Sequence, residues 1–130
     1  MRTDDEAFLA AFETCTLDPA LFDHRGHLRL ALLHLQAQGL GATATTLPGQ
    51  IQRYATHLGA PEKFHATLTH ALLELVQERL TLMPPGTPWE AVLAAHPDLE
   101  RDALALVHER HSPAQLATAE ARQRTLPPDR

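Results

Sequence analysis

Several residue types that would narrow the function are scarce in this chain of 130 residues. It has one cysteine, Cys15, and can therefore form no internal disulfide, no CxxC motif and no cysteine cluster for zinc. No apolar run is long enough to cross a membrane. The residues after Met1 contain no apolar stretch of the kind that a signal peptide needs. We therefore expect a cytoplasmic protein that does not bind a membrane.

Positive charge is also scarce. One lysine, Lys63, and ten arginines face 16 acidic residues, so the formal net charge is −5. Proteins that bind nucleic acid usually carry a basic stripe, and we expect no nucleic-acid partner here. The chain also lacks a glycine-rich phosphate loop, a GxSxG nucleophile elbow, an HExxH zinc motif and an EF-hand loop. These absences exclude the commonest classes of nucleotide-binding protein, serine hydrolase with a nucleophile elbow, zinc metalloprotease and calcium-binding protein.

Apolar residues at helical spacing, separated by proline and glycine, make up most of the chain. The length and the hydrophobic content of 44% fit one globular domain over residues 1–130. No segment alternates like a strand. We predict an all-α fold, a single compact bundle of about five to seven helices. The predicted helices lie at about 4–14, 23–39, 47–57, 61–82, 88–95, 98–110 and 118–124.

Two of these helices are expected to form the centre of the bundle. Leucine and alanine cover most of the circumference of the helix at 23–39, which is typical of a buried helix. The helix from Pro61 has a clean apolar stripe that includes Phe64, Leu68 and Leu72. The start of the helix before it is ambiguous, because Pro48 and Gly49 interrupt the segment: either the helix begins near Leu47, or a longer helix is kinked there.

Some helix boundaries can be predicted from capping residues. Ser112 and Thr118 are each expected to cap a short helix in the last part of the chain. The Thr87-Pro88-Trp89-Glu90 segment reads as a capping box with Pro88 in the first helical position.

Histidine is the abundant residue type whose side chain can bind a metal or transfer a proton. Of nine histidines, His24 and His27 lie three residues apart where one central helix begins, and His65 lies near the start of the other. Imidazole is the commonest metal ligand in proteins, and three nitrogen ligands with an open position are typical of catalytic zinc. We predict that His24, His27 and His65 bind a divalent transition metal, with zinc as the first choice and nickel, iron or copper as alternatives.

The motifs around these histidines also form a longer pattern. The chain resembles a family of small bacterial all-helical proteins with the patterns F-x-H-x-x-H-L-R, K-[FY]-H-x-T-x-T and H-x-S-P and a Pro-Pro-Asp tail. No reaction is attached to that family, so the resemblance selects residues and implies no activity. The chain departs from the pattern at His111, which lacks an aromatic residue between it and Ser112. The matching residues are Phe22, His24, His27, Leu28, Arg29, Lys63, Phe64, His65, Thr67, Thr69, His111, Ser112, Pro113, Pro127, Pro128 and Asp129.

Two other functions fit the same residues. A helix N-terminus favours anions, so a small anionic molecule is an alternative ligand for His24, His27 and Arg29. Thr69 and His111 are further candidates for ligand contact, and Arg29 is otherwise expected in a salt bridge. The third function is a scaffold in which the histidines only cap helices and pack.

The site itself is expected between the N-terminal ends of the two central helices. If it is catalytic, a metal-dependent hydrolase is the expected class, but the sequence does not show that the protein is an enzyme. It does not determine the oligomeric state either.

Overall fold

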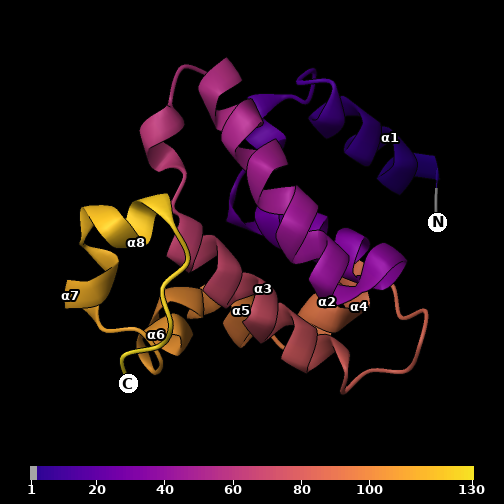
Figure 1. The fold of residues 1–130 in the computed structure, drawn as a ribbon. Coiled ribbons are helices and arrows are strands. Elements are labelled where there is room, and N and C mark those ends of the chain that lie inside the picture. The colour runs from indigo at the N-terminus through magenta and orange to yellow at the C-terminus, as the bar shows by residue number, and fades with distance from the viewer. Residues whose placement is uncertain (1–2) are drawn as a thin grey trace.

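The computed structural model describes residues 3–130, and these residues form helices and loops without a β-strand (Figure 1). The all-α prediction is therefore confirmed. Two 3-10 turns, Pro19–Leu21 and Pro61–Lys63, precede the two longest helices. The α-helices are α1 (Thr3–Glu13), α2 (His24–His57), α3 (Ala66–Leu80), α4 (Trp89–Ala95), α5 (Asp98–Arg101), α6 (Ala103–His108), α7 (Pro113–Leu116) and α8 (Ala119–Gln123).

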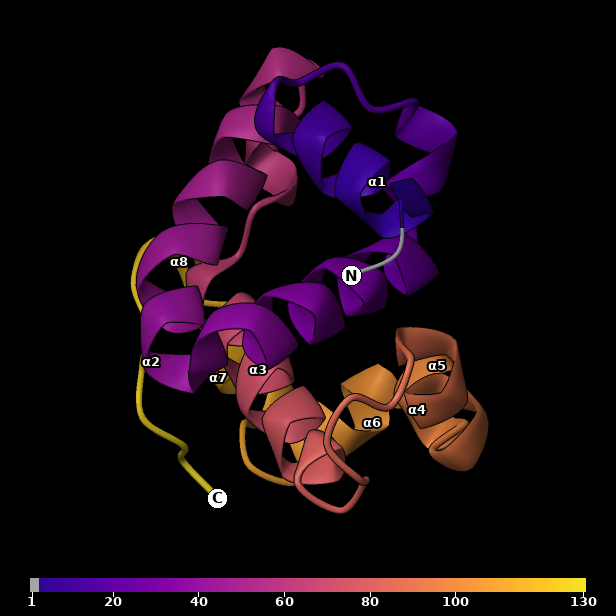
Figure 2. The same ribbon diagram turned by 90° about the vertical axis from the view of Figure 1, so that its right-hand side faces the viewer.

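The longest element, α2, is bent rather than straight. Gly39 lies inside it with φ 80° and ψ 174°, a backbone conformation that glycine adopts readily. Figure 2 shows the two halves of α2 meeting at this bend. The predicted end of a helix at Gly39 is thus confirmed. The second half of α2 follows directly and contains Pro48 within the helix. Of the two alternatives for this segment, the longer helix that includes Pro48 is therefore the one observed.

The first half of α2 is the centre of the molecule. The helix as a whole packs against α1, α3, α4 and α5, and the leucines of its first half are almost completely buried. Leu30 and Leu32 of α2, Val76 of α3, Val92 of α4 and Leu99 of α5 expose no surface. Each such side chain contributes about 1.5–3 kcal/mol by leaving water. Both helices predicted to be central, at 23–39 and from 61 onward, therefore contribute to this core.

The N-terminal ends of α3 and α4 differ from the prediction. Residues 61–63 form a 3-10 turn, Phe64 is extended, and α3 begins only at Ala66. His65 is therefore the N-cap of α3 and does not lie one turn inside it. Similarly, α4 begins at Trp89 with Pro88 as its N-cap, and the Thr87 hydroxyl donates to the Pro84 carbonyl, 2.6 Å away. The predicted capping box at Thr87 is wrong.

The last third of the chain is divided into short helices. The predicted helix at 98–110 is interrupted at Asp102, whose φ of −133° and ψ of 25° are not helical. This interruption brings the number of α-helices in residues 3–130 to eight, above the predicted range. No proline or glycine marks this break in the sequence.

The predicted caps at Ser112 and Thr118 are confirmed. The Ser112 hydroxyl oxygen accepts the Gln115 N–H, and the Thr118 hydroxyl oxygen accepts the Ala121 N–H. Ser112 also donates its own N–H and hydroxyl to the Asp129 carboxylate, at 2.7 and 2.6 Å. The C-terminal segment is thereby held against α7. Among residues 3–130, no helix combines the length and apolar character needed to span a bilayer.

Candidate ligand-binding pocket

His65 is committed to the fold through both ring nitrogens. Its Nδ1 accepts the Leu68 N–H at 3.0 Å and so caps α3. Its Nε2 donates to the carbonyl oxygen of Leu116 in α7, 2.8 Å away. The residue is buried, with 8% of its surface exposed. No ring lone pair remains for a metal in this arrangement.

His24 also binds a distant backbone carbonyl. Its Nε2 lies 2.9 Å from the carbonyl oxygen of Leu99 and donates to it, which ties the start of α2 to α5. The neighbouring Arg25 forms an ion pair with Glu100, which also lies in α5. His24 and His65 are thus oriented toward different segments, α5 and α7, by their own hydrogen bonds.

The expected convergence of three imidazoles is therefore not present. Among the described residues, no group of three His, Cys, Asp or Glu side chains is placed to hold a metal ion. The structure gives His24, His27 and His65 separate partners instead of one centre. Binding of a divalent metal stays a prediction that these observations do not test.

Arg29 lies in a largely buried ion pair at the other side of α2. Its guanidinium is 2.9 Å from the Asp5 carboxylate and stacks over the rings of Phe8 and Trp89. The Trp89 indole N–H donates to the same Asp5 oxygen at 3.1 Å. This salt bridge is the alternative that the sequence offered for Arg29, and it turns the guanidinium toward α1 and α4.

Thr69 and His111 also have internal partners. The Thr69 hydroxyl donates to the carbonyl oxygen of His65, 2.7 Å away. His111 is buried, and its Nδ1 donates to the side-chain oxygen of Gln115 at 2.6 Å. Both side chains stabilise local turns, and neither lines the pocket described next.

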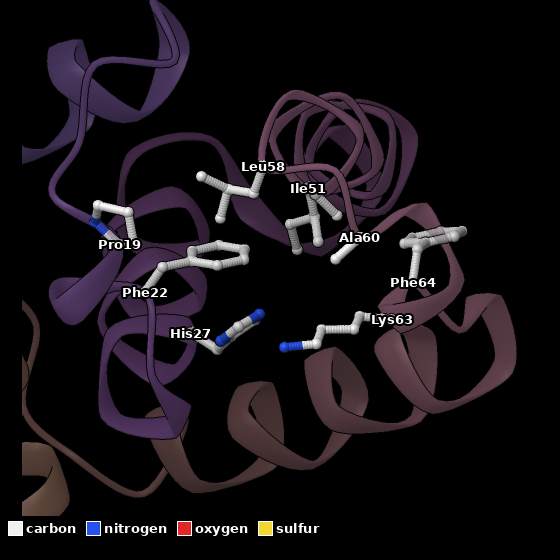
Figure 3. A pocket seen from close by; sticks show the side chains of 9 residues that line it. Pro19, Phe22, His27, Ile51, Leu58, Ala60, Lys63 and Phe64 are labelled. Carbon is white, nitrogen blue, oxygen red and sulfur yellow. The ribbon is translucent and has the colours of Figure 1, made fainter.

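A pocket of about 460 Å³ lies where the two ends of α2 approach the segment before α3. Its walls are apolar and come from three places: Phe22 before α2, Ile51 and Leu58 from the end of α2, and Phe64 before α3. His27 and Lys63 are its basic side chains, and Figure 3 shows them pointing toward each other within it. We call this space the ligand pocket.

His27 is held in the ligand pocket by its helix and by aromatic rings. Its Nδ1 donates to the carbonyl oxygen of Asp23 at 2.8 Å, so the other nitrogen, Nε2, carries the lone pair. The imidazole lies 4.2 Å from the Phe22 ring, which itself contacts Tyr54 at 4.5 Å. Tyr54 is anchored because its hydroxyl donates to the carbonyl oxygen of Leu17. The orientation of His27 is therefore well determined.

The electrostatics of the pocket depend on burial. Burial lowers the pKa of His27 below its usual 6.5, and the positive charge of nearby His24 lowers it further. The hydrogen bond to Asp23 and the Asp23 charge act in the opposite direction, but they do not outweigh burial. His27 is therefore mostly uncharged at neutral pH, and the ammonium of Lys63 supplies the positive charge of the pocket.

Lys63 has no ion pair with any residue that the structure describes. It is exposed and lies in the Pro61–Lys63 turn, with its ammonium at the edge of an apolar space. An ammonium group beside apolar walls, opposite an imidazole with a free nitrogen, can bind the acidic group of an amphipathic molecule.

Sequence reasoning missed Lys63 and Phe22 as members of a site. Both belong to the motifs of the family resemblance, but the residue pattern assigns no role to either. The signal available was that Lys63 is the single lysine of the chain and immediately precedes Phe64 and His65. Comparison with protein-family models, with curated proteins and with solved structures gives no match.

Proposed function

We propose that this protein binds a small amphipathic carboxylate in the ligand pocket. The observation that carries the proposal is the pair of His27 and Lys63, which face each other in an otherwise apolar pocket. Its volume of about 460 Å³ is within the range of roughly 300–1,000 Å³ that is usual for small-molecule sites.

The two basic groups suit the two oxygens of one carboxyl group. The Lys63 ammonium neutralises the charge and donates to one oxygen. The Nε2 of His27 takes up a proton from solvent when the ligand binds and then donates to the other oxygen. The apolar body of the ligand lies against Phe22, Ile51 and Phe64, where each buried CH₂ contributes about 0.8 kcal/mol. One lysine favours a monocarboxylate over a ligand with several charges.

Substitution of Lys63 tests the proposal. Octanoate and benzoate are titrated into the protein by calorimetry, beside octanol and benzyl alcohol, which have similar bodies and no charge. We expect the carboxylates to bind more tightly than the alcohols. Lys63→Met is expected to weaken carboxylate binding about tenfold or more, because an ion pair beside apolar walls is lost.

A matched control separates this effect from the loss of net charge. Arg101→Met removes an exposed cation of α5, outside the ligand pocket, and should leave the affinity unchanged. Lys63→Arg should retain most of it. The proposal fails if the unmodified protein binds neither carboxylate, if the alcohols bind equally well, or if Arg101→Met weakens binding as much as Lys63→Met.

The affinity for the carboxylate should rise as the pH falls. His27 has a lowered pKa in the free protein, and a bound carboxylate raises this pKa by placing a negative charge beside the ring. Binding therefore takes up a proton between the two pKa values, and the dissociation constant at about pH 5.5 should be lower than at about pH 7.5. Octanol, as an uncharged ligand, should not show this dependence. In His27→Gln the pH dependence should be lost, and its persistence there would show that another group takes up the proton.

A further inference from the structure

A second pocket lies at the bend of α2, apart from the ligand pocket. Its volume is about 240 Å³, and we call it the elbow pocket. Leu9 and Glu13 of α1 line one side, His34 and Gln38 come from the first half of α2, and Thr46 and Gln50 come from the second half. The bend at Gly39 is what allows residues from both halves of one helix to line the same space.

Two residues that line the elbow pocket each have a buried polar atom without a hydrogen-bond partner among the described residues. These atoms are Nδ1 of His34 and Oε1 of Gln50. His34 as a whole is only 7% exposed. A buried polar atom without a partner destabilises a fold, and such atoms are rare. Because two residues of one pocket have such atoms, we expect a bound group that forms hydrogen bonds with both.

Three side chains that line the elbow pocket, those of His34, Gln50 and Glu13, can each accept a hydrogen bond. Burial lowers the pKa of His34, so its ring is mostly neutral at neutral pH, although the Glu13 charge opposes this shift. Gln50 offers its amide oxygen, and Glu13 adds a carboxylate. The amide nitrogen of Gln38 is already directed to the hydroxyls of Thr43 and Thr46. Arg53 also lies beside Glu13, where its guanidinium donates to the backbone carbonyl oxygen of Glu13.

We propose that the elbow pocket binds the primary ammonium group of a small alkylamine. An ammonium has three N–H donors and no acceptor. In number these match the Gln50 amide oxygen, the Glu13 carboxylate and Nδ1 of His34, which accepts when the neutral ring carries its proton on Nε2. The charge of Glu13 favours a cation over a neutral hydroxyl compound. The volume and the apolar surface of Leu9 limit the rest of the ligand to a short alkyl chain. This site is independent of the carboxylate site.

The test uses three molecules of the same size. Propylammonium, propanol and propionate are titrated into the full chain while the ring-nitrogen NMR signals of His34 are followed. We expect a saturable shift of the Nδ1 signal with propylammonium, and weaker binding of the other two by at least about fivefold. Gln50→Leu should weaken propylammonium binding by a similar factor.

Further variants distinguish a ligand site from a structural role. His34→Leu, followed by calorimetry, should fold, because it replaces an unpartnered buried polar group with an apolar one of similar size, and it should lose propylammonium binding. His57→Leu, at the exposed end of α2, should bind like the unmodified protein. The proposal is overturned if propylammonium produces no saturable shift, if propanol binds equally well, or if a bound water is the only partner of His34 and Gln50.

Discussion

Replacing Gly26 with alanine is expected to lower the free energy of unfolding by about 2–4 kcal/mol. Gly26 lies in the first turn of α2, where the preceding loop folds back on the helix. A Cβ atom there would lie 1.9 Å from the carbonyl oxygen of Leu21 and 3.0 Å from its carbonyl carbon. These are backbone atoms, which cannot move aside by rotation of a side chain. The loop that places Phe22 beside His27 must therefore shift as a whole.

Thermal and urea unfolding of Gly26→Ala and Gly49→Ala provide the measurement. Gly49 lies in the second half of α2, and a Cβ there meets nothing within 4 Å. Alanine is the better helix former, so Gly49→Ala should stabilise the protein by about 0.5–1 kcal/mol. If both variants were equally stable, the close approach of Leu21 to Gly26 would be wrong. Because Phe22 lines the ligand pocket, Gly26→Ala should also weaken carboxylate binding.

Replacing His65 with alanine is expected to cost about 2–3 kcal/mol of folding free energy. The imidazole makes two hydrogen bonds that hold different parts of the molecule together. Loss of the bond from the Leu68 N–H removes the cap of α3, which is typically worth about 1 kcal/mol. Loss of the other bond leaves the Leu116 carbonyl without its partner at a partly buried position and adds a further penalty.

His65→Asn separates the two contributions. The shorter asparagine can still cap α3, but it cannot reach Leu116, so its stability should lie between those of the unmodified protein and His65→Ala. His57→Ala, at an exposed position, should change stability by no more than about 0.5 kcal/mol. Each protein is also melted with a chelator. If the chelator lowers the melting temperature of the unmodified protein but not of His65→Ala, His65 is a metal ligand and its hydrogen-bonding role is wrong.

The helices that were predicted well are those whose signals are local. Gly39, Ser112 and Thr118 act on the few residues around them, through a preference for positive φ or a side-chain cap, and all three lie where they were expected. The start of α3 was missed because histidine is an uncommon N-cap and Pro61 is an ordinary first helical residue. Whether α3 begins at Pro61 or after His65 depends on the hydrogen bond from His65 to the carbonyl oxygen of Leu116, 51 residues away.

The candidate site shows the same division. The pattern of histidines singled out His27, but it also singled out His24 and His65, which have the same chemistry and similar local surroundings. They differ in what the fold brings to each ring. His24 meets the carbonyl of Leu99 and His65 meets that of Leu116, whereas His27 bonds to its own helix and keeps Nε2 for the pocket.

The sequence by itself determined that the chain is helical, where most of its helices begin and end, and which of them form the core. These properties follow from apolar periodicity and from capping and breaking residues, whose effects extend over a few positions. Only the tertiary structure decided that Lys63 lies opposite His27 and that His34 and Gln50 line one pocket. These pairs are separated by many residues, and they meet because α2 bends at Gly39 and returns toward its own start.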